Sequence, residues 1–184
     1  MTILPIDEIN RFEEELHIHF EDGQIRSKAD EDSILDELED LFLLAYASGL
    51  AGANADLQKS ITADINEIEA VLNEKVAGKT WRERVHEYYT GGGTEADINR
   101  IAETEAHRIT NEAAYDTAVK GGATTKTWNC MMLPTSRDTH IYLDGVSAPI
   151  DGVFTTFMGN QTLYPGEFGV AEEDCNCMCW LTFS

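Results

Sequence analysis

Three cysteines and a histidine near the C-terminus are the residues of this chain best suited to binding a metal ion. Cys175, Cys177 and Cys179 alternate along the sequence, and His140 precedes them. In an extended strand, alternate side chains point to the same face, so the three thiols would lie together. With His140 they offer up to four ligands of the type that zinc prefers. A Cys-x-Cys spacing is less diagnostic than the wider pairs of common zinc sites, because a straight strand holds its sulfurs too far apart for one ion.

The same region offers a second chemistry, which is acid–base or nucleophilic catalysis. Arg137, Asp138 and His140 are residue types that serve acid–base work, and a nearby thiol would be a nucleophile. The sequence contains no glycine-rich phosphate loop, nucleophile elbow or His-Glu-x-x-His helix that would specify an enzyme class. A zinc-dependent enzyme or toxin domain using His140, Cys177 and Cys179 is therefore kept as the alternative interpretation.

Burial in a compact core is the third interpretation of these residues, and the favoured one. Cysteine is among the residue types most often buried, and Arg137, Asp138 and His140 would hold loops together through ion pairs and hydrogen bonds. We therefore predict no catalytic residue and no cofactor, with zinc on His140 and the three cysteines as an option. The expected aromatic core of this segment consists of Trp128, Phe154, Phe157, Phe168, Trp180 and Phe183.

Helical periodicity dominates the first two-thirds of the chain. A stripe of apolar residues follows a predicted N-cap at Ser33, and Gly49 with Gly52 is expected to interrupt it. Two capping-box spacings, Thr80 with Glu83 and Thr94 with Asp97, predict two further helix starts. The four helices are expected at about residues 33–48, 57–76, 80–90 and 94–120.

Beyond Gly122 the helical periodicity disappears, and glycine, threonine and aromatic residues become frequent. The whole chain is predicted to be α+β, with a helical N-terminal two-thirds and a small, irregular, β-rich C-terminal part. We divide it into an acidic helical extension, residues 1–77, and a domain, residues 78–184. The short strands are expected at residues 125–132, 139–143, 153–158 and 176–183.

Charge and hydropathy exclude two classes of partner. The 184 residues carry a formal net charge of −21, and no cluster of lysine and arginine is present to neutralise phosphates, so we do not expect nucleic-acid binding. The longest apolar run, residues 41–51, is much shorter than the roughly 20 residues of a membrane span, so no membrane association is expected. Residues 1–10 lack the features of a secretion signal, so we expect an intracellular protein with reduced thiols.

The order of motifs from about residue 78 to the C-terminus resembles the phage minor head protein family, also called head-morphogenesis or Mu F-like. A helix carrying Thr104 and Glu105 is followed by a tryptophan, an Arg-x-x-His motif, an Asp-Gly turn, a Pro-Gly turn and Asn-Cys-x-Cys. Met178 between the paired cysteines and Cys175 before them depart from the usual family pattern. The motif residues beyond the first two are Trp128, Arg137, Asp138, His140, Asp144, Gly145, Cys177 and Cys179.

This resemblance implies a structural protein that acts in head morphogenesis through protein–protein contacts and has no enzymatic activity. It implies portal or coat proteins as partners, assembly in the host cytoplasm, and a final location in the virion. A homo-oligomer is also possible. The helices within residues 33–77 are either the surface that contacts such partners or part of the internal core, and the sequence leaves both alternatives open.

Overall fold

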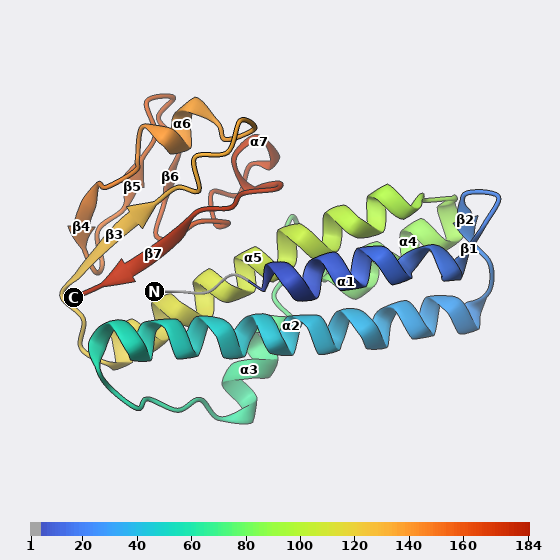
Figure 1. Cartoon of the computed structure of the whole chain (residues 1–184), viewed down its shortest axis with the longest axis horizontal. Coiled ribbons are helices and arrows are strands. Elements are labelled where there is room, and N and C mark those ends of the chain that lie inside the picture. Colours follow the sequence, from blue (N-terminus) through green and yellow to red (C-terminus); the bar gives the residue numbers. More distant parts are fainter. Residues whose placement is uncertain (1–4) are drawn as a thin grey trace.

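The computed structural model describes residues 5–184, so residues 1–4, part of the segment inspected for a secretion signal, lie outside the described residues. Two long helices, α2 (Lys28–Leu57) and α5 (Glu95–Lys120), lie side by side and form the framework of the molecule (Figure 1). Leu38 and Phe42 of α2 and Ile109 of α5 are fully buried in a shared hydrophobic core. The apolar stripes of the two helices therefore satisfy each other.

Shorter elements surround these two helices. The shorter helices α1 (Ile6–Leu16) and α4 (Trp81–Gly91) pack against both long ones, and Trp81 is fully buried with its indole N–H donating to Leu72 O at 2.9 Å. The remaining N-terminal elements are a single 3-10 turn η1 (His17–His19), the hairpin of β1 (Phe20–Glu21) and β2 (Gln24–Ile25), and α3 (Ile65–Leu72).

Both predicted capping boxes are confirmed. The Glu83 carboxylate accepts from Thr80 N–H at 2.8 Å, and the Asp97 carboxylate accepts from Thr94 N–H at 2.9 Å. These bonds satisfy backbone donors that a helix leaves free at its first turn, so each helix begins where the spacing places it. A third box, Asp64 with Glu67, starts α3 and was not predicted.

The predicted break at Gly49 is wrong, because α2 runs through it as one helix of 30 residues. It also begins earlier than predicted, since Ser27 rather than Ser33 accepts from a first-turn N–H, that of Asp30, at 3.2 Å. A Cβ atom on Gly49 would lie 2.1 Å from the Thr110 carbonyl oxygen of α5. The glycine thus allows two helix backbones to approach closely rather than ending a helix.

Replacing Gly49 with alanine should therefore destabilise the protein, although alanine is the better helix former. Forcing one methyl group into a packed contact between backbones typically costs about 1–3 kcal/mol. The measurement is the free energy of unfolding in urea, with Ser48→Ala, one residue earlier on α2, as the control. A Gly49→Ala protein as stable as the Ser48→Ala protein would show that α2 and α5 do not approach this closely.

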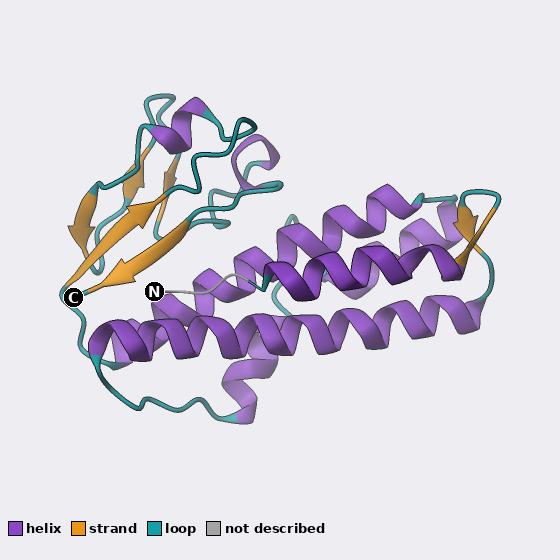
Figure 2. Cartoon of the chain, in the orientation of Figure 1, coloured by secondary structure: helices purple, strands orange, loops and turns teal. Residues whose placement is uncertain are grey.

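The C-terminal part is built on a three-stranded antiparallel sheet at one end of the helical bundle (Figure 2). Its central strand β3 (Thr125–Asn129) pairs with β4 (Ser147–Pro149) and with β7 (Trp180–Phe183). A two-stranded ribbon of β5 (Phe154–Thr155) and β6 (Gln161–Thr162) and the short helices α6 (Asp138–Ile141) and α7 (Ala171–Asp174) complete it. The α+β prediction, with the helices in the first two-thirds, is confirmed.

Two of the predicted strands differ from the structure. Residues 139–143 were expected to be extended, but they lie mainly in α6, which is closed by backbone bonds from His140 N–H to Arg137 O and from Tyr142 N–H to Asp138 O. The expected strand 176–183 begins only at Trp180. Asn176, at φ +53°, lies in the left-handed region, which turns the chain before that strand.

A second core lies beneath this sheet and is formed by Trp128, Phe154 and Phe183, all buried, with Phe168 packed against it. The prediction that Phe157 belongs to this core is wrong, since its side chain is 56 % exposed. Trp180 is only half-buried.

Within residues 33–77, the apolar stripe of the helices is buried in the interior of the molecule. Leu38 and Leu41 of α2 are buried in the first core, so this stripe is not free to contact a partner. Residues on both sides of position 77 share that core. None of the described helices has the length and apolarity that crossing a membrane would need.

Candidate functional site

His140 and two thiols converge between α6 and the segment that leads into β7. The Nδ1 atom of His140 lies 3.5 Å from Cys177 Sγ and 3.5 Å from Cys179 Sγ. The three ligand atoms all lie within 4.8 Å of one another, and all three residues are buried. We call these three residues the Cys–His cluster.

A buried carboxylate stands on the other side of the imidazole. Glu173 Oε2 of α7 lies 3.1 Å from His140 Nε2, which is within ion-pair distance although its alignment does not make a hydrogen bond. Glu173 is 3 % exposed and accepts from Thr139 Oγ1 at 2.8 Å and from Asn160 Nδ2 at 2.9 Å. Burial alone would raise the pKa of Glu173, but these two hydrogen bonds, His140 and Arg137 together lower it. The carboxylate is thus held in its charged form beside the ring.

The two thiols differ in pKa. A hydrogen bond from the Cys179 thiol is the largest cause that lowers the pKa of Cys177, with His140 acting in the same direction against burial. The same bond, followed by burial, raises the pKa of Cys179. Cys177 is therefore the thiol that ionises first.

Aromatic rings enclose the Cys–His cluster. The ring of His140 stacks on Phe168 at a centroid distance of 5.5 Å and meets the edge of Trp128 at 5.6 Å. Trp128 in turn contacts Phe154 at 5.2 Å. A small cavity of about 30 Å³ adjoins the cluster, room for about one water molecule. The Cys–His cluster is a closed, packed centre rather than a cleft for an organic substrate.

Most of the other predicted motif residues hold the backbone around this centre. Asp144 Oδ1 accepts from Cys130 N–H at 2.8 Å, and Gly145 N–H donates to Trp128 O at 2.9 Å from a φ of +74°. The guanidinium of Arg137 donates to Cys175 O. Asp138 is exposed at the start of α6, where its backbone carbonyl accepts a helical bond.

The cysteines fall into two sets. Cys175 was predicted to share a face with Cys177 and Cys179, but it does not belong to the cluster of three, because the chain turns at Asn176. Cys130 is buried and lines the small cavity together with His140 and Cys179. All four thiols are free.

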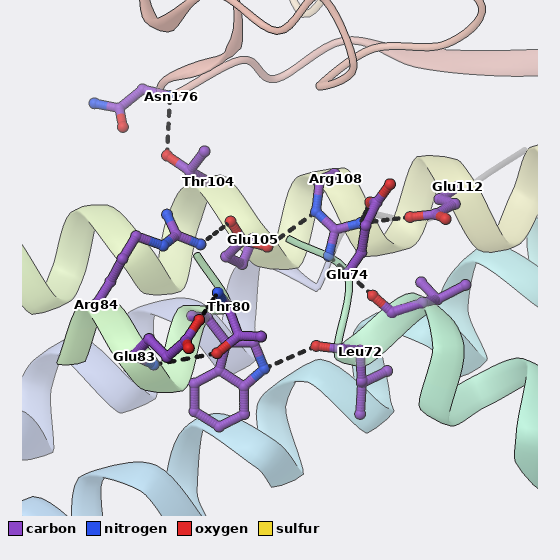
Figure 3. Close-up of polar contacts among 12 residues, drawn as sticks. Leu72, Glu74, Thr80, Glu83, Arg84, Thr104, Glu105, Arg108, Glu112 and Asn176 are labelled. Atoms are coloured by element: carbon purple, nitrogen blue, oxygen red, sulfur yellow. Dashed lines mark hydrogen bonds and ion pairs between the residues drawn. The ribbon is translucent and has the colours of Figure 1, made fainter. Parts of the chain in front are cut away.

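On α5, Thr104 points toward Asn176 of the C-terminal part, whereas Glu105 points toward Arg84 of α4 (Figure 3). Asn176 N–H lies 3.5 Å from Thr104 Oγ1, a long hydrogen bond between the two parts of the molecule. Glu105 is 1 % exposed and binds the guanidinium groups of Arg84 and Arg108.

Arg108 is a central residue that sequence reasoning did not select as a site residue. Its guanidinium is buried and binds Glu105 at 2.9 Å, Glu74 at 2.5 Å, Val71 O at 3.0 Å and the carboxylate of Glu112 (Figure 3). Burial raises the pKa of Glu112 to about 8, with Arg108 opposing the shift. An arginine in a helix with acidic neighbours gives no sequence signal that it is buried.

The Pro-Gly turn of the motif series packs on the same residue. A Cβ atom at Gly166, whose φ is +94°, would lie 3.1 Å from Arg108 Cα. Nearby, Asn111 Nδ2 donates to Cys179 O at 3.0 Å, so α5 also holds the Cys-x-Cys segment directly. The motif residues thus join the sheet, the Cys–His cluster and α5 into one unit.

Comparison with known proteins places the chain among phage head proteins. Residues 55–182 match the family described as Phage Mu protein F like protein, and this match spans more than half of the sequence. The chain belongs to that family, a family of structural phage proteins, which confirms the resemblance drawn from the motif order.

Two relatives give this assignment context. The chain is 32% identical over 91 residues to the minor head protein GP7 of Bacillus phage SPP1, covering 48% of the chain and 30% of GP7. It is 39% identical over 84 residues to the NAD(+)–arginine ADP-ribosyltransferase EFV of Enterococcus faecalis, covering 44% of the chain and 17% of EFV. The chain therefore spans less than a third of either relative. No solved structure matches it.

Proposed function

We propose that this protein is a minor component of a phage head that acts in head morphogenesis by contacting the portal or coat protein. It would assemble in the host cytoplasm and remain in the virion. The family membership and the similarity to a minor head protein support this proposal. Within it, residues 78–184 form the domain that carries the contact, and residues 1–77 form an acidic helical extension that supports it.

An exposed apolar surface on the C-terminal part is the observation that carries the contact. Tyr142, Phe157 and Met158 are 60 %, 56 % and 71 % exposed, and the first two rings lie 5.7 Å apart. We call these three residues the C-terminal apolar surface. It borders a hollow of about 580 Å³ between α6 and α7. Aromatic and methionine side chains beside a hollow are typical of the centre of a protein interface.

The test is co-sedimentation with proheads assembled from the portal and coat proteins of the same phage. The double variant Phe157→Ser, Met158→Ser should bind at least tenfold more weakly than the original chain, because it removes the apolar anchors and leaves both cores intact. Ile65→Ser, which removes an equally exposed apolar side chain from α3, is the matched control and should bind normally.

Equal binding of the double variant and the control would contradict the proposed surface. Loss of self-association by the double variant, with no binding of the original chain to proheads, would instead assign the surface to contacts between copies of this chain. Circular dichroism of each variant checks that the helices are retained.

The similarity to an ADP-ribosyltransferase raises an enzymatic function as the competing possibility. That match covers 17% of EFV, and the buried motif residues His140 and Cys179 border a cavity of about 30 Å³, which is too small for a dinucleotide. Incubation with NAD⁺ and an arginine-containing acceptor substrate should therefore leave the NAD⁺ intact. Consumption of NAD⁺ that depends on this chain would contradict the structural function.

A further inference from the structure

We propose that Cys130, His140, Cys177 and Cys179 bind one zinc ion that fastens the C-terminal part of the molecule. This inference stands on the geometry of the Cys–His cluster and does not depend on the proposed role in the phage head. The ion would have a structural role, joining β3, α6 and the segment before β7.

The distances within the Cys–His cluster fit a single tetrahedral ion. With zinc–sulfur bonds of about 2.3 Å and zinc–nitrogen bonds of about 2.0–2.1 Å, neighbouring ligand atoms lie roughly 3.6 Å apart. The observed separation from His140 Nδ1 to each of Cys177 Sγ and Cys179 Sγ is 3.5 Å. An ion therefore fits among the three atoms with little movement of the backbone. The chain from Cys177 to Cys179 is irregular and precedes β7, so it brings the two sulfurs together, which a straight strand would not do.

The surroundings of His140 resemble those of a metal-bound histidine, with the Glu173 carboxylate at ion-pair distance rather than in hydrogen-bond alignment. Such a histidine usually directs its second ring nitrogen toward a carboxylate, which fixes the tautomer and leaves the first nitrogen free to bind the metal. Here Nε2 faces the buried Glu173 at 3.1 Å, while Nδ1 faces the two sulfurs. Glu173 is itself held by Thr139 and Asn160, so the orientation of the ring is set before any ion arrives.

Cys130 lies outside the group of three close ligand atoms but is placed to supply the fourth ligand once its thiol turns toward them. The pairing of β3 with β7 places Asn129 opposite Trp180, and the same register continued by one residue places Cys130 opposite Cys179. Side chains in such pairs lie about 4.5–5.5 Å apart at Cβ, within reach of a shared ion. Cys130 is buried and lines the 30 Å³ cavity beside Cys179 and His140, so its thiol has room to turn toward the ion.

The chemical type of the four ligands favours zinc over other metal ions. Three thiolates and one imidazole form a Cys₃His site, a common structural zinc site, and these soft ligands disfavour magnesium and calcium. Each thiol gives up its proton to solvent when it binds. Three thiolates around Zn²⁺ leave a net charge of −1 and Glu173 adds a further negative charge beside His140, so Arg137, which lines the same cavity, offsets the charge in part.

The experiment uses the full chain, expressed without a histidine tag in medium supplied with zinc. Elemental analysis should find about one zinc per chain. After exchange with Co²⁺, the protein should show the near-ultraviolet absorption of cobalt–thiolate bonds. Cys130→Ser should remove roughly a third of that absorption, and Cys177→Ser or Cys179→Ser should abolish tight zinc binding. Cys175→Ser is the matched control, a thiol outside the proposed site, and should behave like the original chain.

Glu173 provides a second test that keeps every ligand. Glu173→Gln should weaken zinc binding by roughly 10–100-fold, measured by competition with a chelator of known affinity, because it disturbs the orientation of His140. Glu172→Gln, on the exposed neighbouring residue, is the control and should leave the affinity unchanged.

Clear results would overturn the proposal. One is a folded original chain without zinc, with no cobalt–thiolate absorption and a melting temperature that a chelator leaves unchanged. Another is a disulfide between two of these cysteines, detected as the loss of two free thiols. Unchanged cobalt absorption in Cys130→Ser would remove Cys130 from the ligand set.

Discussion

Replacing Trp128 with alanine should lower the free energy of unfolding by about 3–5 kcal/mol, the usual cost of removing a fully buried tryptophan. The side chain has no exposed surface and contacts Phe154, Phe168 and His140. Its loss would leave a large void between the sheet and the Cys–His cluster. Because many domains are stable by only about 5–15 kcal/mol, this variant should approach global unfolding. Denaturant melts followed by circular dichroism measure the effect.

Two control variants test whether the loss of stability comes from the burial of the Trp128 side chain. Trp180→Ala removes a tryptophan side chain that is only half-buried, from the neighbouring strand, and should lower the free energy of unfolding clearly less. Trp128→Phe should also cost less than the alanine variant, because the indole N–H is buried without a hydrogen-bond partner and a phenyl ring fills most of the space. Equal stability of Trp128→Ala and the original chain would show that the second core is assigned wrongly.

Replacing Arg108 with methionine should cost about 3–5 kcal/mol, because it leaves buried carboxylates without their cation. Methionine keeps much of the side-chain volume, so the loss is mainly electrostatic. Glu105 is almost fully buried, and Glu74 and Glu112 lie on the same guanidinium. Arg108 opposes the burial that raises the pKa of Glu112, so the folded variant should hold that proton more tightly, and the deficit should grow as the pH rises from about 7 to about 9. Urea melts at both pH values measure it.

A control on the same helix separates buried from exposed charge. Arg100, whose ion pair with Asp97 is half-exposed to solvent, should tolerate methionine with a change of about 0–1 kcal/mol. Adding Glu105→Gln to Arg108→Met should recover part of the loss, because it removes a buried charge that has lost one of its two arginine partners and keeps only Arg84. The contrary result is a double variant whose free energy of unfolding falls below the value predicted by adding the effects of the two single substitutions. It would show that Glu105 is not stabilised by Arg108.

The sequence predicted best the features that local chemistry determines. The capping boxes at Thr80 and Thr94 start their helices as expected, since a cap involves only residues within one turn. The break predicted at Gly49 is wrong because the contact of that glycine is with Thr110, far away in the sequence. A glycine that admits a neighbouring helix and a glycine that ends a helix look the same until the tertiary packing is known.

The same limit applies to the candidate site. His140, Cys177 and Cys179 are brought together as the motif order suggested, although His140 lies on a short helix rather than on the predicted strand. Glu173 was not predicted, because its partners are set only by the packing of α7 on α6. Arg108 was missed for the same reason. Burial of a charged side chain is a property of the folded molecule, and no spacing in the sequence announces it.

The structural role in the phage head is tested most directly by measuring how many copies of this chain the finished head contains. Heads purified to homogeneity and washed in high salt should retain a small, constant number of copies per particle by quantitative mass spectrometry. The high-salt wash matters because binding through apolar contacts resists salt, whereas loose electrostatic association does not. Finding the chain abundant in the infected cell but absent from washed heads and from their assembly intermediates would contradict the structural role proposed for it.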